Sequence, residues 1–143
     1  MKESIFSVPV KVRYYDTDLS RAVFFTNYIK WFDSIALPDF TDALGIDWRS
    51  LLDQNVDAVI AHVSFDYKAP CYLDDVVDIH ITGVDIGKTS MTIYGALYKE
   101  KALVAEGKLV YVFVDYTTRK PEPIPRFFKE KINAHIRDIE KEG

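Results

Sequence analysis

The chain has 143 residues, 48% of them hydrophobic and 28% charged, with 18 basic and 22 acidic side chains and a formal net charge of -4. This length is near the commonest domain size, so we expect a single domain over residues 1–143. The net charge gives no broad positive field, which excludes a general nucleic-acid binder, and the absence of a long apolar run or a leader pattern predicts a cytoplasmic protein with no membrane partner.

The first predicted element is a strand over residues 7–15, where Val8, Val10, Val12 and Tyr14 alternate with polar residues or proline. Asp16 and Asp18 end this strand, because aspartate is depleted in strands and enriched in turns. A loop on a rigid scaffold can expose a side chain to a ligand, so Asp18 is the first candidate for catalysis. The alternative is a turn residue or helix cap, which is the commoner role of a lone aspartate after a strand.

A helix is predicted next, with Thr26 as its N-cap and apolar positions at i, i+3, i+4 and i+7, which are Tyr28, Trp31, Phe32 and Ile35. We expect a kink or an end at Pro38 and a later stop at Leu44-Gly45. The start of a helix carries unpaired N–H groups and a partial positive charge. Amides near Phe25 could therefore polarise a carbonyl group beside Asp18.

The remaining elements predict an α+β fold in which a five-stranded antiparallel sheet curves around the one apolar helix. A short helix is expected over residues 48–54, strands over 58–67, 76–84, 90–99 and 102–115, and a charged helix over 125–142. Both faces of the last strand are apolar, with Leu109, Tyr111 and Phe113 on one face and Val110, Val112 and Val114 on the other. One helix covers only one face, so a second subunit or the terminal segment must cover the other, and we predict a homodimer at minimum.

Metal and cofactor sites are not expected. Cys71 is the only cysteine, and His62, His80 and His135 are far apart in sequence, without the spacing of a metal-binding motif. Cys71 beside Pro70 is best explained as a small buried residue.

The span from Tyr14 to Asp33 resembles the 4-hydroxybenzoyl-CoA thioesterase family, including its bacterial acyl-CoA thioesterase branch, which has the hotdog fold. In that family a D-x-D loop precedes a valine and an aromatic position, and Asn-Tyr follows on the central helix. The matching residues are Asp16, Thr17, Asp18, Val23, Phe24, Phe25, Asn27 and Tyr28, continued by Trp31, Phe32 and Asp33. Weaker matches extend over most of the chain, through Asp75–Val77, Gly87–Ser90, Phe113–Asp115 and the segment from Lys120 to Pro125.

The resemblance implies hydrolysis of an acyl-CoA thioester, with Asp18 as nucleophile or general base and with active sites where two subunits of a homodimer or homotetramer meet. Candidate substrate-binding residues are Tyr14, Phe25, Asn27, Tyr28, Lys88 and Ser90, with Arg119 as a further basic candidate for the CoA phosphates. The family usually has a glycine three residues after the catalytic aspartate, where this chain has Arg21. Glycine permits a backbone conformation that a long side chain rarely shares, and Arg21 could instead face an anionic group of the substrate.

Two alternatives remain open from the sequence. One is a hotdog relative that binds an acyl thioester without hydrolysing it, or that dehydrates its substrate, although no histidine lies near the helix for dehydration. The other is a structural dimerisation module in which Asp18 only caps the helix.

Overall fold

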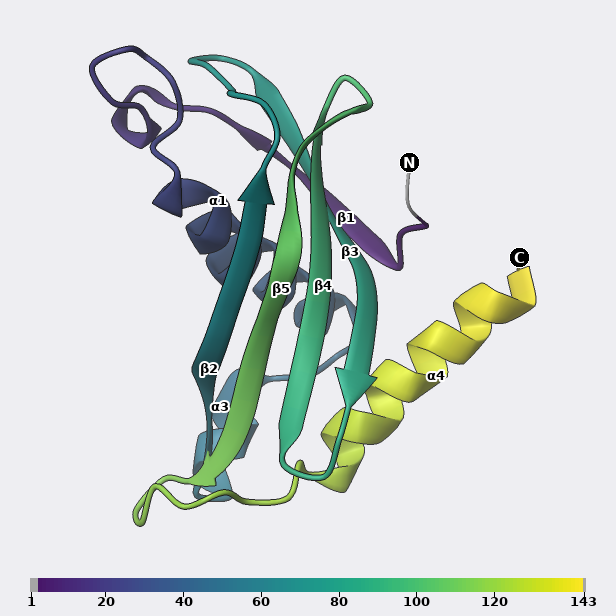
Figure 1. Cartoon of the computed structure of the whole chain (residues 1–143). Coiled ribbons are helices and arrows are strands. Elements are labelled where there is room, and N and C mark those ends of the chain that lie inside the picture. Colours follow the sequence, from purple (N-terminus) through teal and green to yellow (C-terminus); the bar gives the residue numbers. More distant parts are fainter. Residues whose placement is uncertain (1–2, 143) are drawn as a thin grey trace.

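The computed structural model describes residues 3–142. Its elements in chain order are β1 (Phe6–Lys11), η1 (Tyr14–Asp16), α1 (Thr26–Trp31), η2 (Phe32–Ala36), α2 (Leu37–Ala43), α3 (Trp48–Asp53), β2 (Val56–Tyr67), β3 (Val76–Ile86), β4 (Ser90–Lys99), β5 (Ala102–Asp115) and α4 (Arg126–Glu142). The strands form one antiparallel sheet of five strands in the order β1-β3-β4-β5-β2, as Figure 1 shows. The predicted α+β architecture is therefore confirmed.

The first strand is shorter than predicted. It ends at Lys11, opposite Val76, the first residue of the neighbouring strand β3. Beyond Val12 the chain turns into the 3-10 segment η1, where the Arg13 amide donates to the Asp16 carboxylate at 2.8 Å. The assignment of Tyr14 to a strand was therefore wrong: its side chain lies in this turn and is 80% exposed.

The central helix runs without a break from Thr26 to Ala43 through α1, η2 and α2. The N-cap position is held by Phe25, whose side chain makes no capping bond, so the prediction of Thr26 as the cap was wrong. The helix does not end at Pro38, and the turn immediately before α2 is instead a wider π turn, Phe32–Ala36. Proline lacks an N–H group and crowds the preceding turn, which explains the irregular hydrogen bonding at this point. The predicted stop at Leu44-Gly45 is confirmed, with Gly45 in the left-handed conformation at φ 74°.

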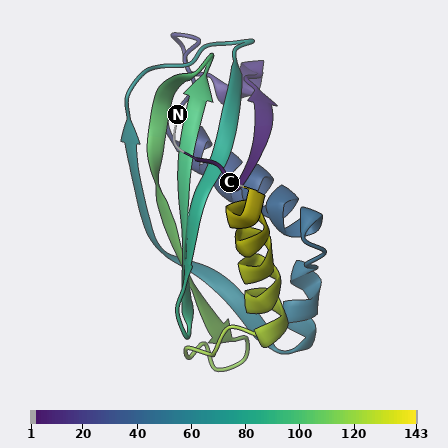
Figure 2. The same cartoon turned by 90° about the vertical axis from the view of Figure 1, so that its right-hand side faces the viewer.

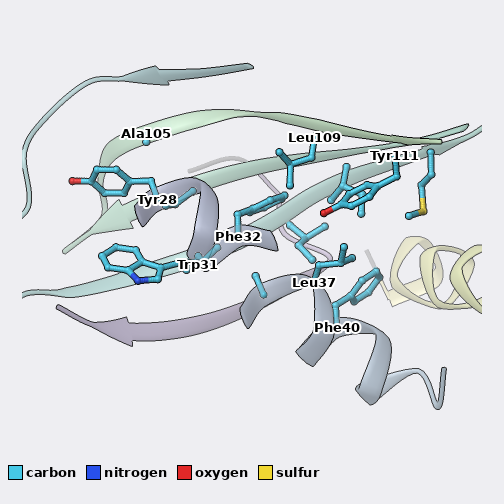
Figure 3. Packing of buried hydrophobic residues seen from close by; sticks show 14 of the residues in the cluster. Tyr28, Trp31, Phe32, Leu37, Phe40, Ala105, Leu109 and Tyr111 are labelled. Carbon is cyan, nitrogen blue, oxygen red and sulfur yellow. The ribbon is translucent and has the colours of Figure 1, made fainter. Parts of the chain in front are cut away.

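One face of this helix packs on the sheet and forms the core. Phe32 is fully buried, and Figure 3 shows its ring between the helix and the strands. A side chain on Gly95 of β4 would overlap this ring, so the absence of a Cβ there lets Phe32 lie directly on the sheet. The other core residues that Figure 3 labels are Tyr28, Trp31, Leu37, Phe40, Ala105, Leu109 and Tyr111.

The terminal helix α4 lies on the same side of the sheet as the central helix (Figure 2). Phe128 contacts the rings of Phe113 and Trp48, and His135 Nε2 lies 2.8 Å from the carbonyl oxygen of Ile5. The segment after β5 turns back beside the end of that strand, where Pro121 forms a bridge with Val114 and the Glu122 amide donates to the Phe113 carbonyl at 2.8 Å. Val110 and Val112 remain half-buried. Among the described residues, no helix is both long and apolar enough to cross a membrane.

Candidate active site

Asp18 lies in a tight loop between η1 and α1, at one end of the sheet. The Asp18 amide donates to Ala22 at 3.0 Å, and the Arg21 amide donates back to the Asp18 carbonyl at 3.0 Å. Thr17 and Val23 form an antiparallel bridge at the base of the loop. Arg21 adopts φ 65°, the left-handed conformation for which glycine is best suited, so this chain accepts strained backbone in order to keep an arginine in the loop.

The Asp18 carboxylate is exposed and held by Ser20. Its Oδ1 accepts the Ser20 amide at 2.8 Å and the Ser20 hydroxyl at 2.6 Å. Because these bonds stabilise the charged form, the hydroxyl most of all, they lower the pKa of Asp18 below its usual value of 3.8. The carboxylate is therefore ionised at neutral pH, as either a nucleophile or a general base must be.

The other carboxylate of the loop has a different environment. Asp16 is 6% exposed, and its carboxylate accepts the Arg13 amide. Its backbone carbonyl accepts the Phe24 amide at 3.0 Å and the Asn27 side-chain amide at 2.8 Å. Asp16 and Asn27 thus fix the Asp18 loop to the start of the helix, which gives Asn27 a positioning role.

The beginning of the helix offers free donors. Within residues 3–142, the backbone N–H groups of Phe25 and Thr26 donate to no protein acceptor. The Phe25 ring is 55% exposed, and its carbonyl accepts the Tyr67 hydroxyl at 3.0 Å, which ties the helix start to the end of β2. Two unpaired amides at the start of an 18-residue helical run, Thr26–Ala43, can stabilise negative charge that develops on an oxygen.

The predicted substrate-binding residues do not all gather at this end. Phe25 and Asn27 lie beside the loop, whereas Tyr28 is buried, with its hydroxyl against the Cys71 thiol and with its pKa raised mainly by burial. Lys88 and Ser90 lie at the turn between β3 and β4, at the opposite end of the sheet in Figure 1. Arg119 lies at that far end too, where its guanidinium is 3.0 Å from Asp57. Lys88, Ser90 and Arg119 therefore cannot meet Asp18 within one chain.

Two further residues belong to this site, Ser20 and Tyr67, and neither was predicted from the sequence. Ser20 follows Asp18 by two positions, and an aspartate side chain commonly accepts a hydrogen bond from the backbone amide two residues later. The role of Ser20 could therefore have been predicted from this spacing. Tyr67 is 42 positions from Phe25, and nothing local to either residue indicates their hydrogen bond. Within residues 3–142, no group of three or more His, Cys, Asp or Glu side chains is arranged to hold a metal ion.

The model of the thioesterase-like superfamily matches residues 12–132. The chain belongs to this superfamily. It is 26% identical over 127 residues to an acyl-CoA thioester hydrolase, YbgC, of Escherichia coli, covering 88% of this chain and 94% of that one. It is 27% identical over 142 residues to a 1,4-dihydroxy-2-naphthoyl-CoA hydrolase of a Synechococcus strain, covering 92% of this chain and 95% of that one.

Solved structures agree on the fold. A 1,4-dihydroxy-2-naphthoyl-CoA thioesterase from Synechocystis superposes with a TM-score of 0.81 at 16% identity, covering 94% of this chain and 97% of that one. The predicted hotdog fold and the predicted family are thus confirmed, and so is the assignment to the thioester hydrolases as a class.

Proposed function

We propose that the chain hydrolyses an acyl-CoA thioester to a carboxylic acid and free CoA, with Asp18 as the catalytic residue. The observation that carries this proposal is an exposed, ionised carboxylate in a loop that Asn27 and Asp16 fix to a helix start with two free amides. The names of the superfamily and of the two relatives support the same chemistry.

The amides of Phe25 and Thr26 would hold the thioester oxygen as it gains negative charge. In one route the Asp18 carboxylate attacks the carbonyl carbon, the carbon–sulfur bond breaks, and CoA leaves as the thiolate. Water then hydrolyses the mixed anhydride and regenerates the carboxylate. In the other route Asp18 accepts a proton from the water that attacks the carbonyl carbon. Both routes require an ionised Asp18.

A second copy of the chain would complete the site. Strand β2 lies at an edge of the sheet, and three of its side chains on the helix side are exposed: Ile60 by 43%, Val63 by 38% and Tyr67 by 42%. An edge strand with an apolar strip is suited to pairing with its own copy about a two-fold axis. Antiparallel pairing of two β2 strands would place the Asp18 loop of one chain beside the far end of the other. Lys88, Ser90 and Arg119 of that copy could then approach the substrate.

The test is thiol release from short, long and aromatic acyl-CoAs by the wild type, Asp18→Asn and the control Asp39→Asn. Asp39 is an exposed carboxylate on α2, so its variant matches the charge change away from the loop. We expect kcat to fall about a hundredfold or more in Asp18→Asn and to stay unchanged in the control. Equal turnover in all three proteins, or none from any acyl-CoA, would sink the proposal and favour a binding or structural role.

A further inference from the structure

A hollow opens on the helix side of the sheet, next to the edge strand β2. Its volume is about 210 Å³, and it is lined by Asp33, Leu37, Pro38, Trp48, Ala58 and Tyr111. A second hollow of about 170 Å³ lies between α3 and the start of β2 and shares Trp48 and Ala58 as lining. The function proposed above does not use either hollow.

The walls of the first hollow are fixed by hydrogen bonds and packing. The Tyr111 hydroxyl donates to Asp33 Oδ1 at 2.5 Å, which joins the central helix to β5 and closes one side. Figure 3 shows the Tyr111 hydroxyl directed toward the helix. Trp48 Nε1 donates to the Thr41 hydroxyl at 2.7 Å, and the Trp48 ring packs on Phe128 with centroids 5.2 Å apart. The indole therefore cannot rotate without losing both contacts.

The interior of the described part of the chain offers no open path between its own Asp18 loop and this hollow. Asp33 is eight residues after Phe25, about 12 Å along the helix axis at 1.5 Å per residue. The intervening space holds buried aromatic rings, among them Phe32 packed on Phe65 with centroids 5.8 Å apart. The hollow is open instead beside β2, where Asp33, Pro38 and Ala58 are half-buried.

The paired arrangement proposed above brings a different Asp18 loop to the hollow. Tyr67, which bonds Phe25 beside the loop, is at one end of β2, and Ala58 is near the other end. A two-fold axis across the middle of β2 exchanges these ends. The partner's loop would therefore stand over the hollow of this chain.

We propose that this hollow receives the acyl group of the substrate held by the partner's Asp18 loop, and that Trp48 sets the upper limit on acyl size. This inference rests on the proposed function. If each non-hydrogen atom occupies roughly the 30 Å³ of a water molecule in the liquid, the hollow takes about seven such atoms. That number suits a straight chain of about six to eight carbons or a single ring. The second hollow, which Trp48 also lines, would take about five or six more atoms.

The test is the dependence of kcat/KM on acyl length, from acetyl-CoA to palmitoyl-CoA. For the wild type we expect a steep fall beyond about eight carbons. For Trp48→Ala we expect an upward shift of this limit by about five or six carbons, because loss of the indole joins the two hollows. The matched control Trp48→Phe keeps a ring as the wall and should keep the wild-type limit. Ala58→Phe fills the hollow and should lower the limit.

Several outcomes would overturn the inference while leaving the proposed hydrolysis intact. These are an unchanged length profile in both Trp48→Ala and Ala58→Phe, or a wild type that already prefers palmitoyl-CoA. Loss of overall stability in Trp48→Ala would lower activity at every length without moving the limit, so the profile separates a size filter from a structural role. If no acyl-CoA is hydrolysed, the proposed function fails, and the inference is then tested by calorimetric binding of hexanoate and dodecanoate to the same variants. Binding without a size limit that depends on Trp48 contradicts the inference, and so does the absence of binding.

Discussion

Asp18 and Asp16 are two positions apart, yet their surroundings give them different properties. Asp16 is buried and bonded to the Arg13 amide, whereas Asp18 is exposed with Ser20 as its partner. A carboxylate that takes part in hydrolysis must be reached by substrate and water, and only Asp18 meets this condition. In the sequence motif the two aspartates look alike. Their different burial and hydrogen-bond partners arise only when the loop folds and directs the Arg13 amide at Asp16 and the Ser20 amide at Asp18.

Removal of the Ser20 hydroxyl should change the pH dependence of hydrolysis. The Ser20 bonds stabilise the ionised form and hold the pKa of Asp18 low, so Ser20→Ala should raise that pKa toward its usual value of 3.8. Because activity requires the ionised form, the acid limb of kcat/KM should lie at higher pH in Ser20→Ala than in the wild type.

The measurement is kcat/KM between about pH 2 and pH 6, a range that includes the ordinary aspartate pKa and lower values. Ser20→Thr keeps a hydroxyl at this position and should restore the wild-type limb. A limb that stays in place in Ser20→Ala, or moves to lower pH, would contradict the assignment of Asp18 as the group that must be ionised.

The central helix and the sheet approach each other closely at Phe32 and Gly95. A methyl group at residue 95 would overlap the Phe32 ring, whereas a methyl group at Gly83 would meet Tyr94 Cδ2 at 3.5 Å, an ordinary contact. We therefore expect Gly95→Ala to lower the free energy of unfolding by about 1–3 kcal/mol, the usual effect of overpacking a core. Gly83→Ala is the matched control and should change it by less than about 1 kcal/mol.

Urea unfolding of the two variants measures this difference. Adding Phe32→Leu to Gly95→Ala should recover part of the lost stability, because a smaller side chain leaves room for the new methyl group. Equal stability of the two alanine variants would show that the helix can move away from the sheet at no cost.

The elements that could be predicted from sequence are those whose periodicity is strong. The strand predictions for residues 90–99 and 102–115 agree with β4 and β5, and the short helix and the terminal helix were each placed within one residue. The first strand was extended too far because Val12 and Tyr14 continue its alternation, but its pairing with β3 ends at Lys11. The π turn before Pro38 depends on how that helix packs, and the sequence pattern shows only that proline disturbs it.

The candidate site was partly predictable for a similar reason. Asp18, Phe25 and Asn27 are close in sequence, so one local motif contains them. Trp48, Ala58 and Tyr111 come together only in the folded chain, through α3 and the pairing of β2 with β5. Lys88 and Ser90 were assigned to the same site as Asp18, yet one chain separates them by the length of the sheet, which is consistent with a site built from two copies.

At the scale of the whole molecule, the proposed site requires two chains, one that supplies Asp18 and another that supplies the hollow. The exposed helix-side residues of β2 are the surface on which the two chains would meet. An assembly of this kind has at least twice the 16.5 kDa mass of the chain. Such a site also allows two inactive variants to complement each other in a heterodimer, which is impossible when the whole site lies within one chain.

Asp18→Asn removes the carboxylate but keeps the hollow, and Ala58→Phe fills the hollow but keeps the carboxylate. Each homodimer should be inactive toward hexanoyl-CoA. In a heterodimer, Asp18 of the Ala58→Phe chain faces the open hollow of the Asp18→Asn chain, so one of the two sites is intact. Heterodimers isolated through two different affinity tags should therefore show about half of the wild-type activity, as expected from the two-fold symmetry.

Heterodimers of Asp18→Asn with a differently tagged Asp18→Asn chain are the control and should stay inactive. Isolation of the mixed species itself shows that the chains associate. If the Asp18→Asn and Ala58→Phe chains associate but hydrolyse no thioester together, the carboxylate and the hollow must act within one chain. The acyl group would then have to follow a path past Phe32 and Phe65, where the structure has packed aromatic rings.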